Sequence, residues 1–145
     1  LFQKSLRDMI KGIRAVREKE EEYINQELTR IQKEIKSPDP KTKAVALQKM
    51  TYLHMSGHDM SWCSFHCIEV MSQGRFGLKH TGYLAAQQSF LDNTDVLLLI
   101  TNLLKKDLAS ANVHEAGFAL DCLANVMTPD LARDLVADIF SLLNR

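Results

Sequence analysis

The chain has 145 residues, of which 46% are hydrophobic and 25% charged, and its formal net charge is zero. These values fit a single globular domain over residues 1–145 and exclude a disordered chain. Residues 1–75 carry 13 Lys or Arg against 10 Asp or Glu (+3), and residues 76–145 carry 5 against 8 (−3). The strongly basic balance of a general nucleic-acid-binding protein is therefore absent.

The first two predicted helices are amphipathic. Apolar side chains recur at helical spacing, which places each set on one face of a helix. The two sets are Leu6, Met9, Ile10 and Ile13, then Ile24, Leu28, Ile31 and Ile35. Between them, the glutamate-rich segment Glu18–Glu22 suits the start of the second helix, because carboxylates are stabilised at the positive end of the helix dipole.

A break follows the second predicted helix. Two prolines within residues 37–40 exclude a continuous helix, and Asp39 followed by Pro40 is typical of an N-cap and a first helical turn. The helix that begins there is expected to end near Gly57. Further helices are predicted over residues 61–74, 78–91 and 95–109.

The C-terminal part predicts two more helices with recognisable starts. Asn112, followed three residues later by Glu115, predicts a capping box for the first. The segment Thr128–Asp130 opens the second, since threonine is a favoured N-cap and proline is tolerated in the first turn. Its predicted buried line is Leu131, Leu135, Ile139 and Leu142.

Three segments of the chain resemble one another. Ala44–Leu47, Thr81–Leu84 and Ala116–Ala119 recur 37 and 35 residues apart, and in the last two an aromatic residue follows a glycine. A glycine inside a helix costs about 1 kcal/mol relative to alanine, so its recurrence predicts close helix–helix approach. We therefore predict an all-α fold, an α-solenoid of HEAT- or armadillo-like antiparallel helix pairs.

Spacing and missing motifs argue against a metal site and against a hydrolase site. His54 and His58, like Cys63 and Cys67, are four residues apart, but Gly57 separates the histidines and the cysteines lack the close-set pairs of structural zinc sites. No Gly-x-Ser-x-Gly turn or phosphate-binding loop is present. We predict no metal ligands, no cofactor and no catalytic residues, and hence no enzyme.

The first predicted helix carries a basic face. Lys4, Arg7, Lys11 and Arg14 lie opposite its apolar stripe. Such a helix can face an anionic membrane, and these four residues are our candidate membrane-facing site. The alternative is an ordinary helix of a bundle, whose apolar stripe packs on the next repeat or on a partner subunit.

Several longer motifs resemble the large adaptins, the trunk subunits of clathrin-type adaptor complexes. They are Thr51–Asp59, Gly82–Ala85 and Lys106–Leu108. Within that family, four segments are similar to the delta-type chain of the third adaptor complex. They are Ser61–Trp62, Ile68–Met71, Gln88–Phe90 and Thr128–Leu135. The chain lacks a leading Met and ends within a helical pattern, so we expect an N-terminal trunk fragment of a longer subunit.

The resemblance implies a scaffolding role in vesicle-mediated transport. Family members assemble from two large chains, a medium mu chain and a small sigma chain, and a trunk of this type would cradle sigma beside a second large beta chain. An Arf-family GTPase would recruit the complex to Golgi or endosomal membranes, where it sorts cargo to lysosomes or vacuoles. The protein is thus expected to be cytoplasmic and peripheral on membranes, with partner surfaces near the first two helices and near Gly82–Tyr83.

An alternative of another class is a free-standing phosphoinositide-binding helical domain of a trafficking protein. In the plasma-membrane relative, a run of lysines on the helix before the Gly-His-Asp turn binds phosphoinositides. Only Lys43 of that run is present in this sequence, which argues against phosphoinositide binding at this place. The basic face of the first helix keeps the alternative open.

Overall fold

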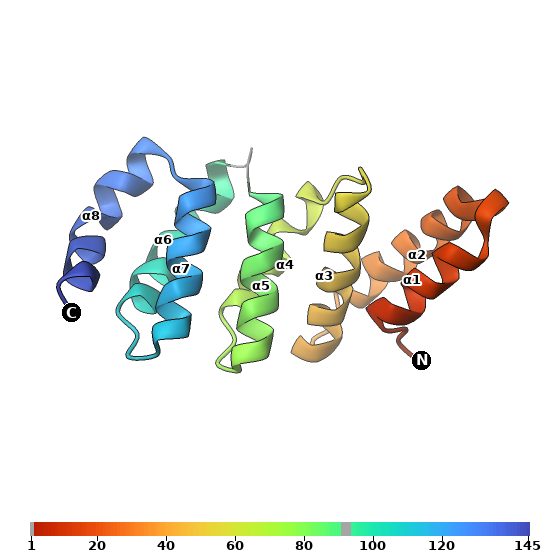
Figure 1. The fold of residues 1–145 in the computed structure, drawn as a ribbon, viewed down its shortest axis with the longest axis horizontal. Coiled ribbons are helices and arrows are strands. Elements are labelled where there is room, and N and C mark those ends of the chain that lie inside the picture. The colour runs from red at the N-terminus through yellow and green to blue at the C-terminus, as the bar shows by residue number, and fades with distance from the viewer. Residues whose placement is uncertain (1, 91–93) are drawn as a thin grey trace.

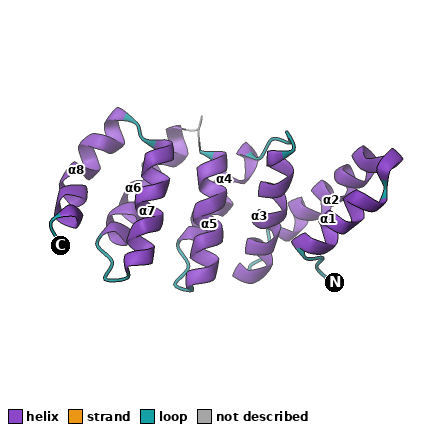
Figure 2. Ribbon diagram, in the orientation of Figure 1, coloured by secondary structure: helices purple, strands orange, loops and turns teal. Residues whose placement is uncertain are grey.

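The computed structural model describes residues 2–90 and 94–145. Within this part of the chain the structure is entirely helical, with short connections and no strand (Figure 2). The helices are α1 (Leu6–Ala15), α2 (Glu20–Glu34), α3 (Pro40–Met55), α4 (Ser64–Met71), α5 (Phe76–Ser89), α6 (Thr94–Leu108), α7 (Val113–Val126) and α8 (Pro129–Leu143). Short 3₁₀ turns at Arg17–Lys19 and Ser61–Cys63 precede α2 and α4.

The helices stack in two layers, with the N- and C-termini at opposite ends of the stack (Figure 1). One layer contains α1, α3, α5 and α7, and each of these helices packs against the next. In the other layer α6 lies between α4 and α8 and contacts both. This arrangement confirms the predicted α-solenoid, in which each helix buries its apolar face against its neighbours.

Most of the predicted helix starts are confirmed. Asp39 accepts hydrogen bonds from the backbone N–H groups of Lys41 and Thr42 at the start of α3. Thr128 accepts one from Leu131 at the start of α8. The helix predicted from residue 61 is a 3₁₀ turn followed by α4, and the one predicted over 78–91 is α5, which ends at Ser89. Residue 91 lies outside the described residues.

The capping box predicted at Asn112 is wrong. Asn112 caps α7 by accepting a hydrogen bond from His114 N–H. Glu115 does not reach back to Asn112, because its carboxylate accepts from the Ser110 hydroxyl at 2.6 Å, and the Asn112 N–H already donates to Ser110 Oγ at 3.1 Å. A capping box is instead present at α1, between Ser5 and Asp8.

The predicted apolar stripes form a continuous core. Met9, Ile31, Ile35 and Leu135 have no exposed surface, and Leu6, Leu28, Ile139 and Leu142 pack against the core from its edge. Ile10 is only half-buried. Because the core runs through every helix pair, the solenoid is stabilised along its whole described length.

The two recurring glycines differ in their surroundings. A Cβ atom at Gly82 would lie 2.4 Å from the backbone nitrogen of Met71, so α4 and α5 approach closely as predicted. At Gly117 no atom lies within 4 Å of the equivalent position, so the prediction of close approach is wrong there. Phe118 beside it is half-buried and stacks on His80 of α5, with ring centroids 4.6 Å apart.

Candidate interaction surfaces

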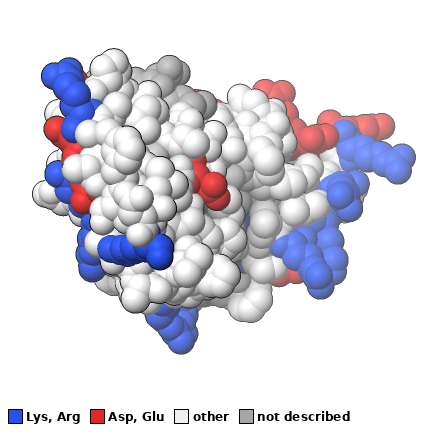
Figure 3. Space-filling view, turned by 60° about the vertical axis from the view of Figure 1, so that its left-hand side comes forward, with Lys and Arg blue, Asp and Glu red and all other residues white. Residues whose placement is uncertain are grey.

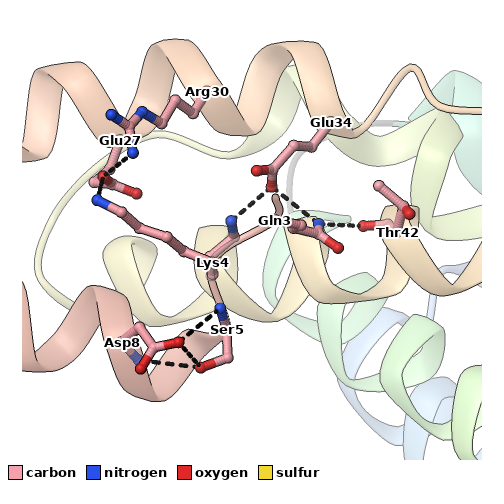
Figure 4. Close-up of polar contacts among 9 residues, drawn as sticks. Gln3, Lys4, Ser5, Asp8, Glu27, Arg30, Glu34 and Thr42 are labelled. Atoms are coloured by element: carbon pink, nitrogen blue, oxygen red, sulfur yellow. Dashed lines mark hydrogen bonds and ion pairs between the residues drawn. The ribbon is translucent and has the colours of Figure 1, made fainter. Parts of the chain in front are cut away.

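The four residues of the basic face predicted on α1 differ in their surroundings. Arg7, Lys11 and Arg14 are exposed. Lys4 precedes α1 and points back toward α2, where its Nζ lies 2.9 Å from Glu27 Oε1 and 3.3 Å from the Tyr23 hydroxyl (Figure 4). The Lys4 ammonium is therefore paired with a carboxylate, although 31% of the Lys4 side chain is exposed.

Glu27 makes Lys4 a structural residue. Its side chain is 1% exposed, one of its carboxylate oxygens has no hydrogen-bond partner, and Arg30 approaches the other at 3.4 Å. The hydrogen bond to Glu27 raises the pKa of Lys4 above its ordinary value, although partial burial opposes the shift. Lys4 thus acts as the counter-ion of a carboxylate that α2 holds against the core.

Replacing Lys4 with methionine is expected to lower the free energy of unfolding by about 1–2 kcal/mol, because Glu27 would keep only its long contact with Arg30. The matched change Lys11→Met, on the exposed face of the same segment, should alter stability by less than about 0.5 kcal/mol. Urea denaturation followed by circular dichroism measures both. Equal stability of the two variants would show that Lys4 has no structural role.

A second polar cluster fixes the segment before α1. Gln3 donates from its side-chain amide to Glu34 Oε2 at 3.0 Å and to the Thr42 carbonyl at 2.9 Å (Figure 4). Lys49, which has no exposed surface, donates to the same Glu34 oxygen at 2.6 Å. These bonds join the N-terminal segment to α2 and α3 and hold α1 in place.

A buried polar triad joins α5 to α6. Lys79 donates to both oxygens of Asp107, at 2.9 and 2.8 Å, and the Tyr83 hydroxyl donates to Asp107 at 2.6 Å. Burial and this hydrogen bond raise the pKa of Tyr83 above its ordinary value. Tyr83 is 1% exposed and Gly82 is buried, so these two residues belong to the core, and the partner surface predicted near them stays a prediction.

The histidines and cysteines do not assemble into a ligand set. His54 Nδ1 lies 3.0 Å from the backbone carbonyl of His58, and Cys63, Cys67 and Cys122 are buried free thiols. Burial raises the pKa of Cys122 to about 12. Among residues 2–90 and 94–145, no group of three or more His, Cys, Asp or Glu side chains is placed to hold a metal ion.

The three thiols should be unreactive while the chain is folded, since all three are buried and therefore shielded from the reagent. We expect almost no reaction with Ellman's reagent at pH 8, and complete reaction of all three cysteines in denaturant. The variant Ser141→Cys adds an exposed thiol and should react at once, as a positive control. Rapid reaction of the unchanged protein would show that its helices open under native conditions.

Charge on the surface is uneven. In the view of Figure 3 the broad area toward the viewer is largely without Lys, Arg, Asp or Glu, and charged side chains gather at its margins. None of the described helices combines the length and the apolar character needed to cross a membrane.

Comparison of this chain with known proteins shows similarity to one family. Residues 20–145 match the family described as the adaptin N-terminal region. The chain is 48% identical over 149 residues to the AP-3 complex subunit delta of Saccharomyces cerevisiae and 50% identical over 144 residues to that of Arabidopsis thaliana. It is 46% identical over 144 residues to the AP-3 complex subunit delta-1 of Bos taurus.

These similarities cover 99% of this chain but only 16%, 17% and 12% of the three relatives. The chain thus spans less than a fifth of the length of these proteins. It is also similar to a chain in a homology model of the full-length AP-3 complex in an intermediate open conformation, with a TM-score of 0.64 and 48% identity. That match covers 74% of this chain and 19% of the other.

Proposed function

Since this chain belongs to the adaptin family, we propose that it is an N-terminal trunk segment of a delta-type large subunit. In this role it acts as a non-catalytic scaffold of an adaptor complex in vesicle-mediated transport between the Golgi or endosomes and the lysosome or vacuole. The observation that carries the proposal is the identity of nearly 50% to AP-3 delta subunits along almost the whole chain. The two-layer stack supports it, because solenoids bind partners along extended faces.

The partners we propose follow from the same membership. The trunk segment binds the small sigma subunit and, within the complex, stands beside the mu and beta chains. An Arf-family GTPase recruits the assembly to the membrane, so the chain is peripheral on Golgi or endosomal membranes. The hydrogen bonds of Lys4 with Glu27 and of Gln3 with Glu34 support this role, because they hold the segment before α1 against α2.

We propose that the exposed side chains Arg7, Lys11 and Arg14 form the membrane-facing part of α1. Lys4 precedes them in the chain and pairs with Glu27. Each cation close to an anionic surface contributes about 1 kcal/mol of attraction. Three such charges give weak binding that adds to GTPase-dependent recruitment and does not replace it.

The trunk role is tested in the full-length delta subunit. Exchanging the segment that corresponds to this chain for that of the AP-1 complex subunit gamma-1, which is 37% identical in Schizosaccharomyces pombe, keeps the fold and changes its surface. We expect affinity-purified complex to lose the AP-3 sigma chain and to retain beta and mu. Retention of sigma at normal stoichiometry would contradict the proposal.

A second function is favoured by one observation, the exposed basic face of α1. A free-standing phosphoinositide-binding domain would bind liposomes containing phosphoinositides as the isolated chain and would lose binding on charge reversal of Arg7, Lys11 and Arg14. The adaptor proposal instead predicts weak binding by the isolated chain and a strong increase in the assembled complex. Co-sedimentation with liposomes distinguishes the two functions.

A further inference from the structure

Two leucines interrupt the polar outer face of α6. The exposed residues of this helix recur at helical spacing, and they are Asp95, Leu98, Leu99, Asn102 and Lys106. Leu98 is 70% exposed and Leu99 is 53% exposed. Single exposed leucines are ordinary, but these two are adjacent and each lines a separate groove beside α6.

The first groove lies between α6 and the helices α3 and α4. Leu99 forms one wall, and Phe65, which is 64% exposed, lines it from α4 together with Ile68. Pro38 and Pro40 line its α3 side. The charged groups that line this groove, Lys43 and Glu69, form an ion pair with each other.

The second groove lies between α6 and α8 and has an acidic rim. Leu98 lines it together with Leu97 and Leu131, and three carboxylates surround them. These are Asp95, Asp130 and Asp134. Asp130 pairs with Arg133, whereas Asp95 and Asp134 form no ion pair with any described residue. The rim therefore carries a local excess of negative charge next to exposed apolar side chains.

We propose that this double groove on α4, α6 and α8 binds a basic amphipathic segment of a partner protein. Apolar side chains of the segment enter the grooves on either side of the Leu98–Leu99 pair, and its Lys or Arg side chains face Asp95 and Asp134. Burial of exposed leucine and phenylalanine provides affinity. The unpaired carboxylates provide charge complementarity, which sets the rate and the specificity of association.

The same charges disfavour the other occupants of an apolar face. An anionic membrane surface would be repelled by the carboxylates of Asp95 and Asp134. A second copy of this chain would have to offer an apolar and basic segment. The exposed basic residues of α1 lie opposite its apolar stripe, in which Met9 and Ile13 are buried in its own core. A protein segment with interleaved basic and apolar residues fits both features of the groove.

The test uses a fluorescein-labelled synthetic helix in which two leucine pairs one turn apart are flanked by lysines, titrated with this chain by fluorescence anisotropy. We expect Leu98→Ser with Leu99→Ser to weaken binding at least 10-fold. Asp95→Asn with Asp134→Asn should weaken binding about 3- to 10-fold and reduce its salt dependence. All four substituted side chains are exposed, so the core is left unchanged. Circular dichroism confirms that each variant remains folded.

Matched controls separate specific binding from general attraction. Glu21→Gln with Glu22→Gln removes two exposed carboxylates from α2, where the adjoining hollow is lined by polar residues only, and should leave binding unchanged. A scrambled peptide of the same composition should bind at least 10-fold more weakly. Equal binding of the scrambled peptide, or normal binding by the leucine variant, would overturn the proposal. So would leucine-dependent binding to phosphatidylserine vesicles or leucine-dependent dimerisation of the chain.

Discussion

Replacing Asp107 with alanine is expected to lower the free energy of unfolding by about 3–5 kcal/mol, because it leaves the Lys79 ammonium buried without a counter-ion. Lys79 is 4% exposed and Asp107 is 2% exposed, so water cannot replace the lost carboxylate without opening the contact between α5 and α6. The Tyr83 hydroxyl would lose its acceptor in the same step. Urea denaturation of the variant and of the unchanged chain measures the difference.

Two controls identify the cause of this loss. Asp121→Ala removes an exposed aspartate and should change stability by less than about 0.5 kcal/mol. The double variant Lys79→Met with Asp107→Leu removes both charges and should recover most of the stability, since a buried ion pair contributes little beyond a well-packed apolar pair. If the double variant is as unstable as Asp107→Ala, packing and not the unpaired charge is responsible.

The second large effect is expected at Gly82. A methyl group at this position would collide with backbone atoms of Met71 and Val70, at 2.4–2.8 Å, so Gly82→Ala must push α5 away from α4. We expect the free energy of unfolding to fall by about 2 kcal/mol. This is the cost of overpacking minus the gain in helix propensity. Thermal and urea denaturation measure this change.

Gly117 provides a matched control for Gly82. It occupies the equivalent place on α7 and has no neighbour within 4 Å of an added Cβ. Gly117→Ala should therefore stabilise the chain by up to about 1 kcal/mol through helix propensity and reduced entropy of the unfolded state. A destabilising Gly117→Ala, or a neutral Gly82→Ala, would contradict the packing described for this helix pair.

Local patterns in the sequence predicted the helices well. The stripes of α1 and α2 and the caps at Asp39 and Thr128 depend on residues within one or two turns, and the structure confirms them. Asn112 caps α7, but the predicted capping box does not form because the Ser110 hydroxyl donates to Glu115. Local spacing indicates which groups can bond, and it does not decide between two partners within the same reach.

Contacts between distant residues were not predictable in the same way. Asp107 reaches Lys79 and Tyr83 across 28 and 24 residues, and the only signal in the sequence is the spacing of four between those two. Gly82 and Gly117 have similar local sequences but different neighbours. Lys4, predicted as part of the basic face of α1, forms an ion pair with Glu27 on α2. No pattern within α1 could indicate this contact.

We propose that this chain is a trunk segment that holds the small sigma subunit. Co-expression with the sigma subunit of the AP-3 complex, followed by size-exclusion chromatography with light scattering, tests it most directly. The account predicts a stable complex with one copy of each chain, which elutes ahead of either chain alone. Separate elution of a folded, monodisperse chain and a folded sigma subunit would contradict it.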